Sequence, residues 1–129
     1  MGAVLHGDIE DAVIIHLNAR LAVNVYDRVP SVTNDMLPFV IIERTGGPAV
    51  TVVSERPTIV IEAWAKSWRA AQSLMQLARQ AVHDLPGEIV AGVTFSRCDE
   101  WAGPARLPDP VSGYPRFTMS VSLTTRPTP

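Results

Sequence analysis

Apolar side chains recur at helical spacing in two stretches of the chain. The first predicts a helix over residues 9–20, because Asp8 can cap its start and apolar side chains repeat every four residues at Ile9, Val13, Leu17 and Leu21. The second predicts a helix from Ser67 to about residue 85, where Pro86 and Gly87 end it. Its predicted apolar face consists of Ala70, Leu74, Leu77, Ala78, Ala81 and Leu85.

Runs of β-branched residues, bounded by turn formers, predict strands over residues 23–29, 39–44, 49–53, 58–65 and 89–97. Gly46 and Gly47 lie between two such runs and are typical of a hairpin, so the middle three runs predict an antiparallel meander. Gly92 interrupts the last run and predicts a bulge or a bend. The stretch at 31–37 is rich in turn formers and predicts a loop.

The last third of the chain begins with many helix breakers and ends in strict alternation. Prolines and glycines crowd residues 98–115 and predict a long irregular loop. Residues 116–124 alternate apolar with hydroxyl side chains and predict a strand, followed by a short tail over 125–129. The hydroxyl face is typical of exposure to solvent and also suits contact with another sheet or subunit. It consists of Thr118, Ser120, Ser122 and Thr124.

Together these elements predict the α+β class. We expect a single mixed, mostly antiparallel sheet of five to six strands, built from the meander and a C-terminal pair, with two helices packed on one face. The length of 129 residues and the 47% hydrophobic content fit one domain over residues 1–129. Sixteen valines and eight isoleucines against nine leucines favour strands, and the net charge of −2 argues against wholesale disorder.

Composition also limits the partners of the chain. No stretch approaches the roughly 20 apolar residues of a membrane span. A secretory signal is not expected, because Asp8, Glu10 and Asp11 stand where its apolar core would begin. Cys98 is the single cysteine and fits a reducing cytoplasm. Without a basic block, the small negative charge argues against a nucleic-acid footprint.

Histidine and cysteine offer little for catalysis or metal binding. His6, His16 and His83 lie far apart in the sequence, and none has a partner at metal-ligand spacing. Cys98 fits a small buried residue better than a nucleophile, since a nucleophile needs a base beside it. We therefore expect no metal site and no cofactor.

The glycine pair and the acidic residues give no catalytic motif either. No Gly-Lys-Ser/Thr follows Gly46 and Gly47, so they do not form a phosphate-binding loop. Asp99, Glu100 and Asp109 fit solvated loop acids better than a catalytic pair, which needs desolvation and fixed spacing. The sequence therefore predicts a protein that is not an enzyme.

Tryptophan and arginine offer candidates for an interface instead. Trp101 lies in the predicted loop and either folds back as a lid or is presented to a partner. Arg106 and Arg116 flank the same segment and could pair with acids across a subunit boundary. Ten of the 11 basic residues are arginine, which either codon usage in a GC-rich genome or interface function explains.

Several short strings occur in an order that resembles a known family. They are LPFVIIERTGG at 37–47, PTIVIEAWA at 57–65, WAGP at 101–104, LPDP at 107–110 and PRF at 115–117. In this order the chain resembles the tail terminator, or tail completion, proteins of long-tailed bacteriophages, particularly those of actinobacterial hosts. The resemblance covers residues 9–126, and no catalytic signature anchors it.

The resemblance implies an α+β subunit without enzymatic activity that assembles into a ring, typically a hexamer. Such a ring caps the completed tail tube and offers a docking surface to the head–tail connector or neck protein. It would assemble in the host cytoplasm and remain in the virion at the head-proximal end of the tail, and DNA would pass through its lumen without specific binding. From their loop positions, the expected interface residues are Asp35, Met36, Gly46, Gly47, Trp101, Arg106 and Arg116.

Other functions remain open from the sequence. A neck, head-completion or minor tail protein of the same virion would share the assembly role and differ in its docking partner. A small ligand-binding domain or an enzyme would need a deep apolar pocket with convergent polar groups. A nucleic-acid binder would show salt-dependent association with DNA.

Overall fold

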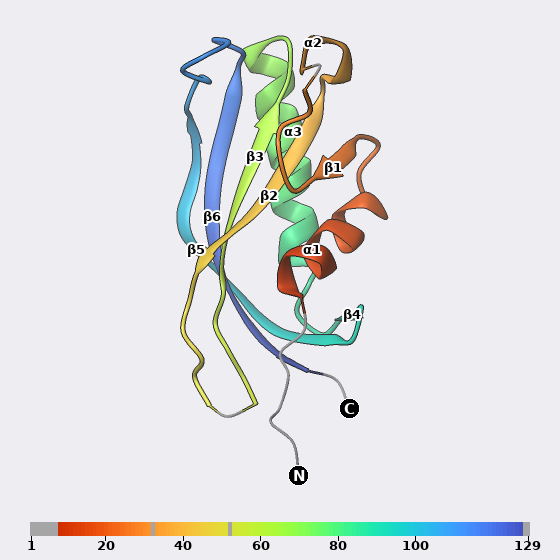
Figure 1. Ribbon diagram of the computed structural model, residues 1–129, viewed down its shortest axis with the longest axis vertical. Helices are drawn as coiled ribbons and strands as arrows, with labels where there is room; N and C mark the ends of the chain where they lie inside the picture. Colours follow the sequence, from red (N-terminus) through yellow and green to blue (C-terminus); the bar gives the residue numbers. More distant parts are fainter. Residues whose placement is uncertain (1–7, 32, 52, 128–129) are drawn as a thin grey trace.

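A computed structural model describes residues 8–31, 33–51 and 53–127 of the chain (Figure 1). His6 lies outside the described residues. The elements follow in the order α1 (Ile9–Asn18), β1 (Asn24–Tyr26), α2 (Thr33–Met36), β2 (Phe39–Gly46), β3 (Thr58–Trp64), α3 (Trp68–His83), β4 (Ile89–Val90), β5 (Val93–Arg106) and β6 (Arg116–Pro127).

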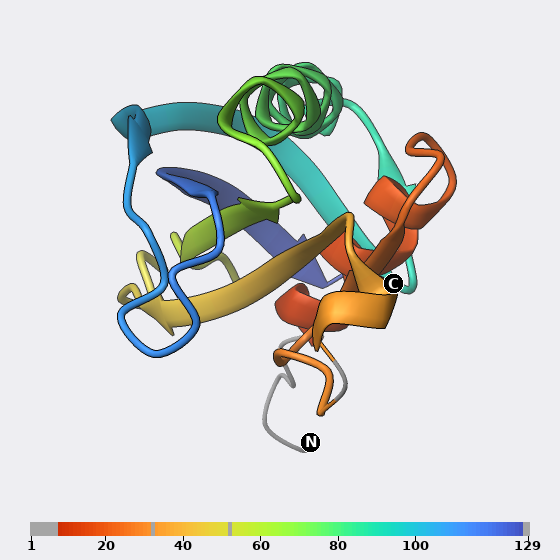
Figure 2. The ribbon, with the colours of Figure 1, turned by 90° about the horizontal axis from the view of Figure 1, so that it is seen from above.

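The strands form one six-stranded sheet in the order β1-β2-β3-β6-β5-β4. β1 runs parallel to β2, and every other neighbouring pair is antiparallel. Seen from above, the sheet is strongly curled, with α1 and α3 beside it (Figure 2). The prediction of an α+β fold with one mixed, mostly antiparallel sheet is therefore confirmed.

Both long helices begin at the predicted caps. The Asp8 carboxylate accepts the N–H of Asp11 at 3.0 Å, and the Ser67 hydroxyl accepts the N–H of Ala70 at 3.1 Å. α1 ends at Asn18, two residues before the predicted end. No helix in the described part of the chain is long and apolar enough to cross a membrane.

The buried stripe of α3 differs in part from the predicted one. Ala70 and Leu77 are exposed, and the helix buries Ala71, Met75 and Val82 in their place. Both stripes share Leu74, Ala78, Ala81 and Leu85, because the 3.6-residue period fixes a stripe along the helix but not its width. The packing of α3 against the curled sheet decides which flank of the stripe is covered.

The predicted three-strand meander is wrong. The antiparallel partner of β2 is β3, with Ile42 opposite Ile61, and no strand forms among the described residues of the stretch 49–53. The described residues of the connection, 47–51 and 53–57, form an arm in which Ala49 and Glu55 make an isolated bridge. β3 is favoured as the return strand because Ile59, Ile61 and Ala63 alternate into the core.

The long loop predicted over 98–115 is also wrong, because β5 continues to Arg106 and only residues 107–115 connect it to β6. The strand tolerates Gly103 and Pro104 because its pairing with β6 shifts register between Glu100 and Ala102 and again between Ala102 and Ala105. Only Val93 and Thr94 pair with β4, so β6 is the only strand neighbour of the rest of β5 in the described chain.

Two smaller predictions also need correction, and one is narrowed. Ala91 and Gly92, with φ of 49° and 79°, form a two-residue turn between β4 and β5, so of the bulge or bend expected at Gly92 the structure shows the bend, as a hairpin turn. α2 replaces part of the loop predicted at 31–37. β6 runs on to Pro127, where a tail was expected from residue 125, because residues 125–127 pair with Val93, Thr94 and Phe95 of β5.

The two faces of the sheet are packed differently. The inner face, covered by α1 and α3, contributes side chains such as Ile61, Met119 and Val121 to the main hydrophobic core. The outer face carries a smaller cluster of Leu37, Phe39, Ile41 and Trp64 at one end, where the Phe39 and Trp64 rings stack 5.4 Å apart. Elsewhere the outer face carries mainly polar side chains, together with the exposed Trp101 and the half-buried Val60.

Candidate functional site on the outer face

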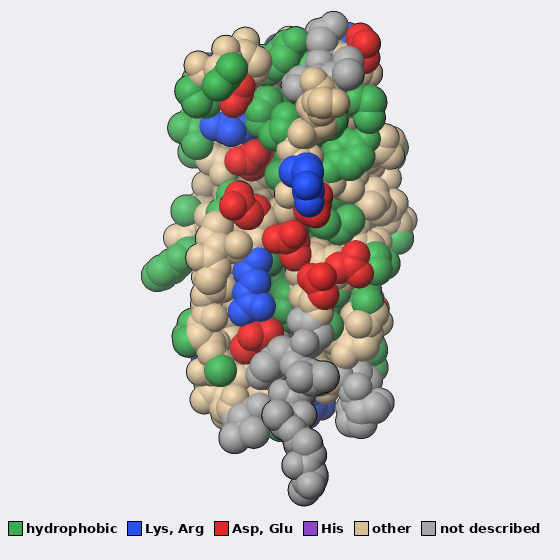
Figure 3. Space-filling model, viewed as in Figure 1, with side chains coloured by type: hydrophobic (Ala, Val, Ile, Leu, Met, Phe, Trp, Pro, Cys, Tyr) green, Lys and Arg blue, Asp and Glu red, His purple; other side chains and the backbone are tan. Residues whose placement is uncertain are grey.

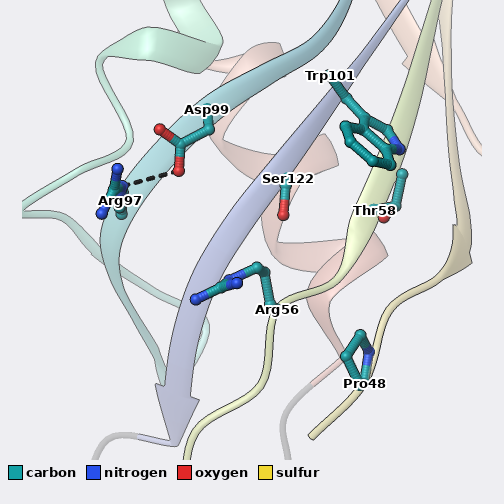
Figure 4. Close-up of a pocket in the computed structure, with 7 residues that line it drawn as sticks. All are labelled: Pro48, Arg56, Thr58, Arg97, Asp99, Trp101 and Ser122. Carbon is teal, nitrogen blue, oxygen red and sulfur yellow. Dashed lines mark ion pairs between the residues drawn. The ribbon is translucent and has the colours of Figure 1, made fainter. Parts of the chain in front are cut away.

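A hollow of about 420 Å³ opens on the outer face, and Figure 4 shows the side chains around it. Its floor is one row across three strands, because Thr58 of β3 and Asp99 of β5 both pair with Ser122 of β6. The short Thr58 and Ser122 side chains give the hollow its depth. Its lining residues are Pro48, Arg56, Thr58, Arg97, Asp99, Trp101 and Ser122.

Trp101 forms one wall of the hollow. It lies on β5 between Glu100 and Ala102, where the pairing with β6 shifts register. The shift leaves this large side chain on the outer face, and 74% of its surface is exposed. Of the alternatives open from the sequence, the structure favours a tryptophan presented at the surface over one folded back as a lid.

The arm forms the opposite wall. Its base is closed by a hydrogen bond from the N–H of Arg56 to the carbonyl of Pro48 at 2.9 Å. Gly47 permits this close approach, since a Cβ atom there would stand 2.1 Å from the carbonyl oxygen of Arg56. An ion pair of 3.0 Å between Arg44 and the buried Glu55 fixes the arm to β2.

The two arginines of the hollow differ in their partners. Arg97 donates to the Asp99 carboxylate at 2.8 Å, as the dashed line in Figure 4 marks. The Arg56 guanidinium makes no hydrogen bond or ion pair with the residues that the structure describes. The hollow thus combines an unneutralised cation with an exposed indole, a pairing typical of residues that dominate protein interfaces.

Elsewhere, charges of both signs are interspersed. Figure 3 shows acidic and basic side chains mixed over the middle of the side seen in Figure 1. Hydrophobic side chains gather at the end that carries α2 and the connection between β5 and β6. Exposed members of this end include Met36, Leu107 and Val111.

Of the residues expected at an interface, only Trp101 lines the hollow. Asp35 and Met36 are exposed on α2, close to the β1 edge of the sheet. Gly46 ends β2, and Gly47 begins the arm. The remaining hollow residues come from the arm, β3, β5 and β6. Of these residues, only Ser122 was indicated as a possible contact residue by the sequence, through the alternating hydroxyl side chains of β6.

The two arginines expected to cross a subunit boundary contact tryptophans of their own chain. Arg106 lies 4.8 Å from the centre of the Trp68 ring. Arg116 stacks on Trp64 at 5.3 Å, approaches Glu62 to 3.5 Å and donates to the carbonyl of Leu107 at 2.8 Å. With 13% of its side chain exposed, Arg116 is a structural link between β6 and its preceding connection.

The interpretation of Asp99, Glu100 and Asp109 as solvated loop acids holds only in part. Asp99 and Glu100 lie on β5, where Asp99 keeps 49% of its side chain exposed. Asp109 lies in the connection to β6, but it and Glu100 are mostly shielded from solvent. Glu100 accepts two bonds from Arg79, at 2.6 and 2.8 Å, and one of 2.7 Å from the His83 ring. Those to Arg79 contribute most to lowering the Glu100 pKa, and that to His83 comes next. This cluster joins α3 to the inner side of β5.

Asp109 serves a different local purpose. Its carboxylate accepts the hydroxyl of Ser112 at 2.6 Å and the backbone N–H of Ser112 at 2.7 Å, which closes a turn before β6. These bonds lower the pKa of Asp109. Like Glu100, it holds a segment in place. The Glu100 partners lie far away in the sequence and are specified by the fold, whereas Ser112 is a local turn partner three residues from Asp109.

The described histidines and the cysteine also have structural contacts. His16 is buried between the two long helices, where its Nε2–H donates to the carbonyl of Ala81 at 2.7 Å, and burial lowers its pKa. Cys98 is half-buried, and burial raises its pKa to about 11, so the thiol stays protonated at neutral pH. No three His, Cys, Asp or Glu side chains in the described ranges converge as a metal site.

Comparison with protein families identifies the family of the chain. A family model described as phage tail termination protein matches residues 6–129, which is nearly the whole chain. No curated protein matches the sequence. The matched range includes every described helix and strand, the arm and all residues of the hollow.

Proposed function

The chain belongs to the phage tail termination protein family, and from this premise we propose that it forms the ring that closes the completed tail tube. Its family gives it a role in the assembly of a phage tail. The match over residues 6–129 carries the proposal, because it covers the fold as a whole and not one motif. The other side of the ring would dock the head–tail connector or neck protein.

The edges of the sheet support assembly into a ring. β1 has three residues and lies at one edge, while β5 beyond Thr94 lies at the other. In a closed ring each subunit uses two different surfaces, and each surface meets its complement on a neighbour. Edge-to-edge contact would also cover strands that a lone subunit leaves open to unwanted pairing.

The chemistry of the chain supports a structural role. Glu100, His16 and Arg116 each join two elements of the fold, and the raised pKa of Cys98 disfavours the reactive thiolate. In the proposed ring, the net charge of −2 and the interspersed charges suit passage of DNA through the lumen without specific contacts. We propose a hexamer, assembled in the host cytoplasm and located at the head-proximal end of the tail.

Deletion of the gene from the phage tests this function most directly. We expect tails of uncontrolled length, counted by electron microscopy of lysates, and restoration of normal length by the wild-type gene. Tails of normal length that fail to join heads would identify a neck or head-completion protein instead. Normal virions would contradict any essential role in tail completion.

Purified protein tests the ring itself. Light scattering and electron microscopy of the full chain, alone and with purified tail tubes, should show closed rings in at least one of the two conditions. A chain that stays monomeric at every concentration and also fails to associate with tubes would contradict the proposal.

A further inference from the structure

The hollow on the outer face carries two groups that lack a partner of matching chemistry. The Arg56 guanidinium has no ion pair with any described residue, and Figure 4 shows its side chain extending toward β6. The Trp101 indole lines another part of the same hollow, beside Thr58, with 74% of its surface exposed. A complementary surface would therefore carry a carboxylate and an aliphatic side chain on the same face.

α1 presents such a surface on the same molecule. Its exposed positions, Asp11, Ile15 and Asn18, follow one another at spacings of four and three residues and so form one stripe. The Asp11 carboxylate makes no hydrogen bond or ion pair within the described ranges, where only its backbone N–H is used. Ile15 is 46% exposed, although the residues on the opposite side of α1 are buried.

The stripe on α1 fits the hollow better than the exposed surface of α2 that carries Asp35 and Met36. Asp11 and Ile15 stand one helical turn apart, which puts their side chains about 5–6 Å from each other on the same face. Asp35 and Met36 also combine an acid with an apolar side chain, but adjacent residues of a helix point in different directions. Of these two surfaces, α1 is therefore the one that offers the acid and the apolar group together on one regular face.

The positions of the two surfaces fit a ring. α1 lies across the sheet from β5 and level with part of that strand (Figure 1), and β5 is the strand that carries Trp101. Rotation about an axis parallel to the long axis of the molecule leaves the position of every surface along that axis unchanged. Copies related by such a rotation can therefore bring α1 of one subunit to the β5 side of the next.

We propose that the hollow of one subunit receives α1 of a second copy of this chain. Asp11 of the incoming helix pairs with Arg56, and Ile15 packs against Trp101. The inference rests on the proposed function for the existence of a ring, and it adds the pair of surfaces that meet in it.

A charge swap tests the contact. Arg56→Glu and Asp11→Arg should each weaken self-association of the full chain by about tenfold or more, because each variant brings like charges together. The double variant should recover association to within about threefold of wild type, since opposite charges face each other again. Sedimentation velocity measures all four proteins, with tail tubes added if wild type needs them to assemble.

Matched controls separate this contact from general effects of charge. Lys66→Glu makes the same charge change as Arg56→Glu at an exposed position between β3 and α3, and it should leave association unchanged. Trp101→Ala should weaken association without changing the circular dichroism spectrum. Arg56→Gln and Asp11→Asn provide milder variants if a reversal prevents folding, and each should weaken association less than the reversal.

Three outcomes would overturn the inference. Wild-type rings that Arg56→Glu leaves unchanged would remove the hollow from the interface while the proposed function stands. Rescue of Arg56→Glu by Asp35→Arg in place of Asp11→Arg would assign the partner surface to α2. Absence of any ring or tube association in wild type would contradict the proposed function as well.

Discussion

The two faces of the sheet have opposite roles, and β6 shows the difference most clearly. Its alternate side chains Phe117, Met119, Val121 and Leu123 are buried under the helices, whereas Thr118, Ser120, Ser122 and Thr124 are half-buried on the outer face. The inner face closes against α1 and α3 and stabilises the fold. The outer face is closed only at one end and keeps groups such as Trp101 available for contact.

β5 repeats this difference with charged residues. Glu100 faces the inner side and is held by Arg79 and His83, with 23% of its side chain exposed. Asp99 faces the outer side, where 49% of its side chain is exposed and Arg97 is its partner. Neighbouring acids in the sequence therefore serve different purposes: the first lines the hollow, and the second joins β5 to α3.

Removing a large side chain from the inner face should have the largest effect on stability. Ile61→Ala leaves a cavity in the main core, and we expect a loss of about 2–5 kcal/mol in the free energy of unfolding. Val60→Ala is the matched control, because Val60 lies on the other face of the same strand and is half-buried. Urea denaturation compares the two, and equal losses would contradict the difference between the faces.

Gly47→Ala should have a somewhat smaller effect, located at the arm. The added Cβ would lie 2.1 Å from the Arg56 carbonyl oxygen, and the backbone has a φ of +104°. We expect a loss of roughly 1–3 kcal/mol together with displacement of the wall of the hollow. Gly46→Ala separates backbone strain from the steric clash of the Cβ atom, since φ there is +124° but nothing lies within 4 Å of the Cβ position. It should cost less and leave self-association intact.

The smallest effect that we expect comes from the buried His16, which should make the free energy of unfolding depend on pH. Burial lowers the His16 pKa below its ordinary value of 6.5, so the unfolded chain binds this proton more readily than the folded chain. The free energy of unfolding should therefore decrease as pH falls below that value, by at most about 1.4 kcal/mol per pH unit from this group. Urea denaturation between pH 7.5 and 5.5 measures the slope.

His16→Gln is the control for this prediction. Glutamine retains an N–H group that can donate to the Ala81 carbonyl and does not titrate, so the slope should become flatter over the same range. An unchanged slope would show that other groups cause the dependence.

Local patterns were sufficient for the elements whose side chains alternate or repeat without interruption. Asp8 and Ser67 marked the starts of α1 and α3, and the alternation after residue 116 predicted β6. β5 was missed after Arg97, because Gly103 and Pro104 break a strand in isolation. The register shifts that accommodate them exist only in pairing with β6, which a local pattern does not contain.

The prediction of residues 49–53 as the return strand was wrong for a similar reason. Residues 49–53 have the composition of a strand, but β3 takes the place beside β2 because its alternate residues complete the core. The candidate site depends on this outcome, since the arm exists only where the meander would have been. Trp101 was expected at an interface from its residue type, whereas Arg56 gave no signal in the sequence.

The sequence by itself determined the α+β class, the two capped helices, the two-faced C-terminal strand and the resemblance to phage tail terminators, because periodicity, caps and short strings are local. Only the tertiary structure decided where the arm closes, which acids are paired and which residues surround the hollow. Pro48, Thr58, Trp101 and Ser122 lie far apart along the chain, and strand pairing across β3, β6 and β5 brings them together. Side-chain pairing between distant segments depends on sheet register, which no single segment specifies.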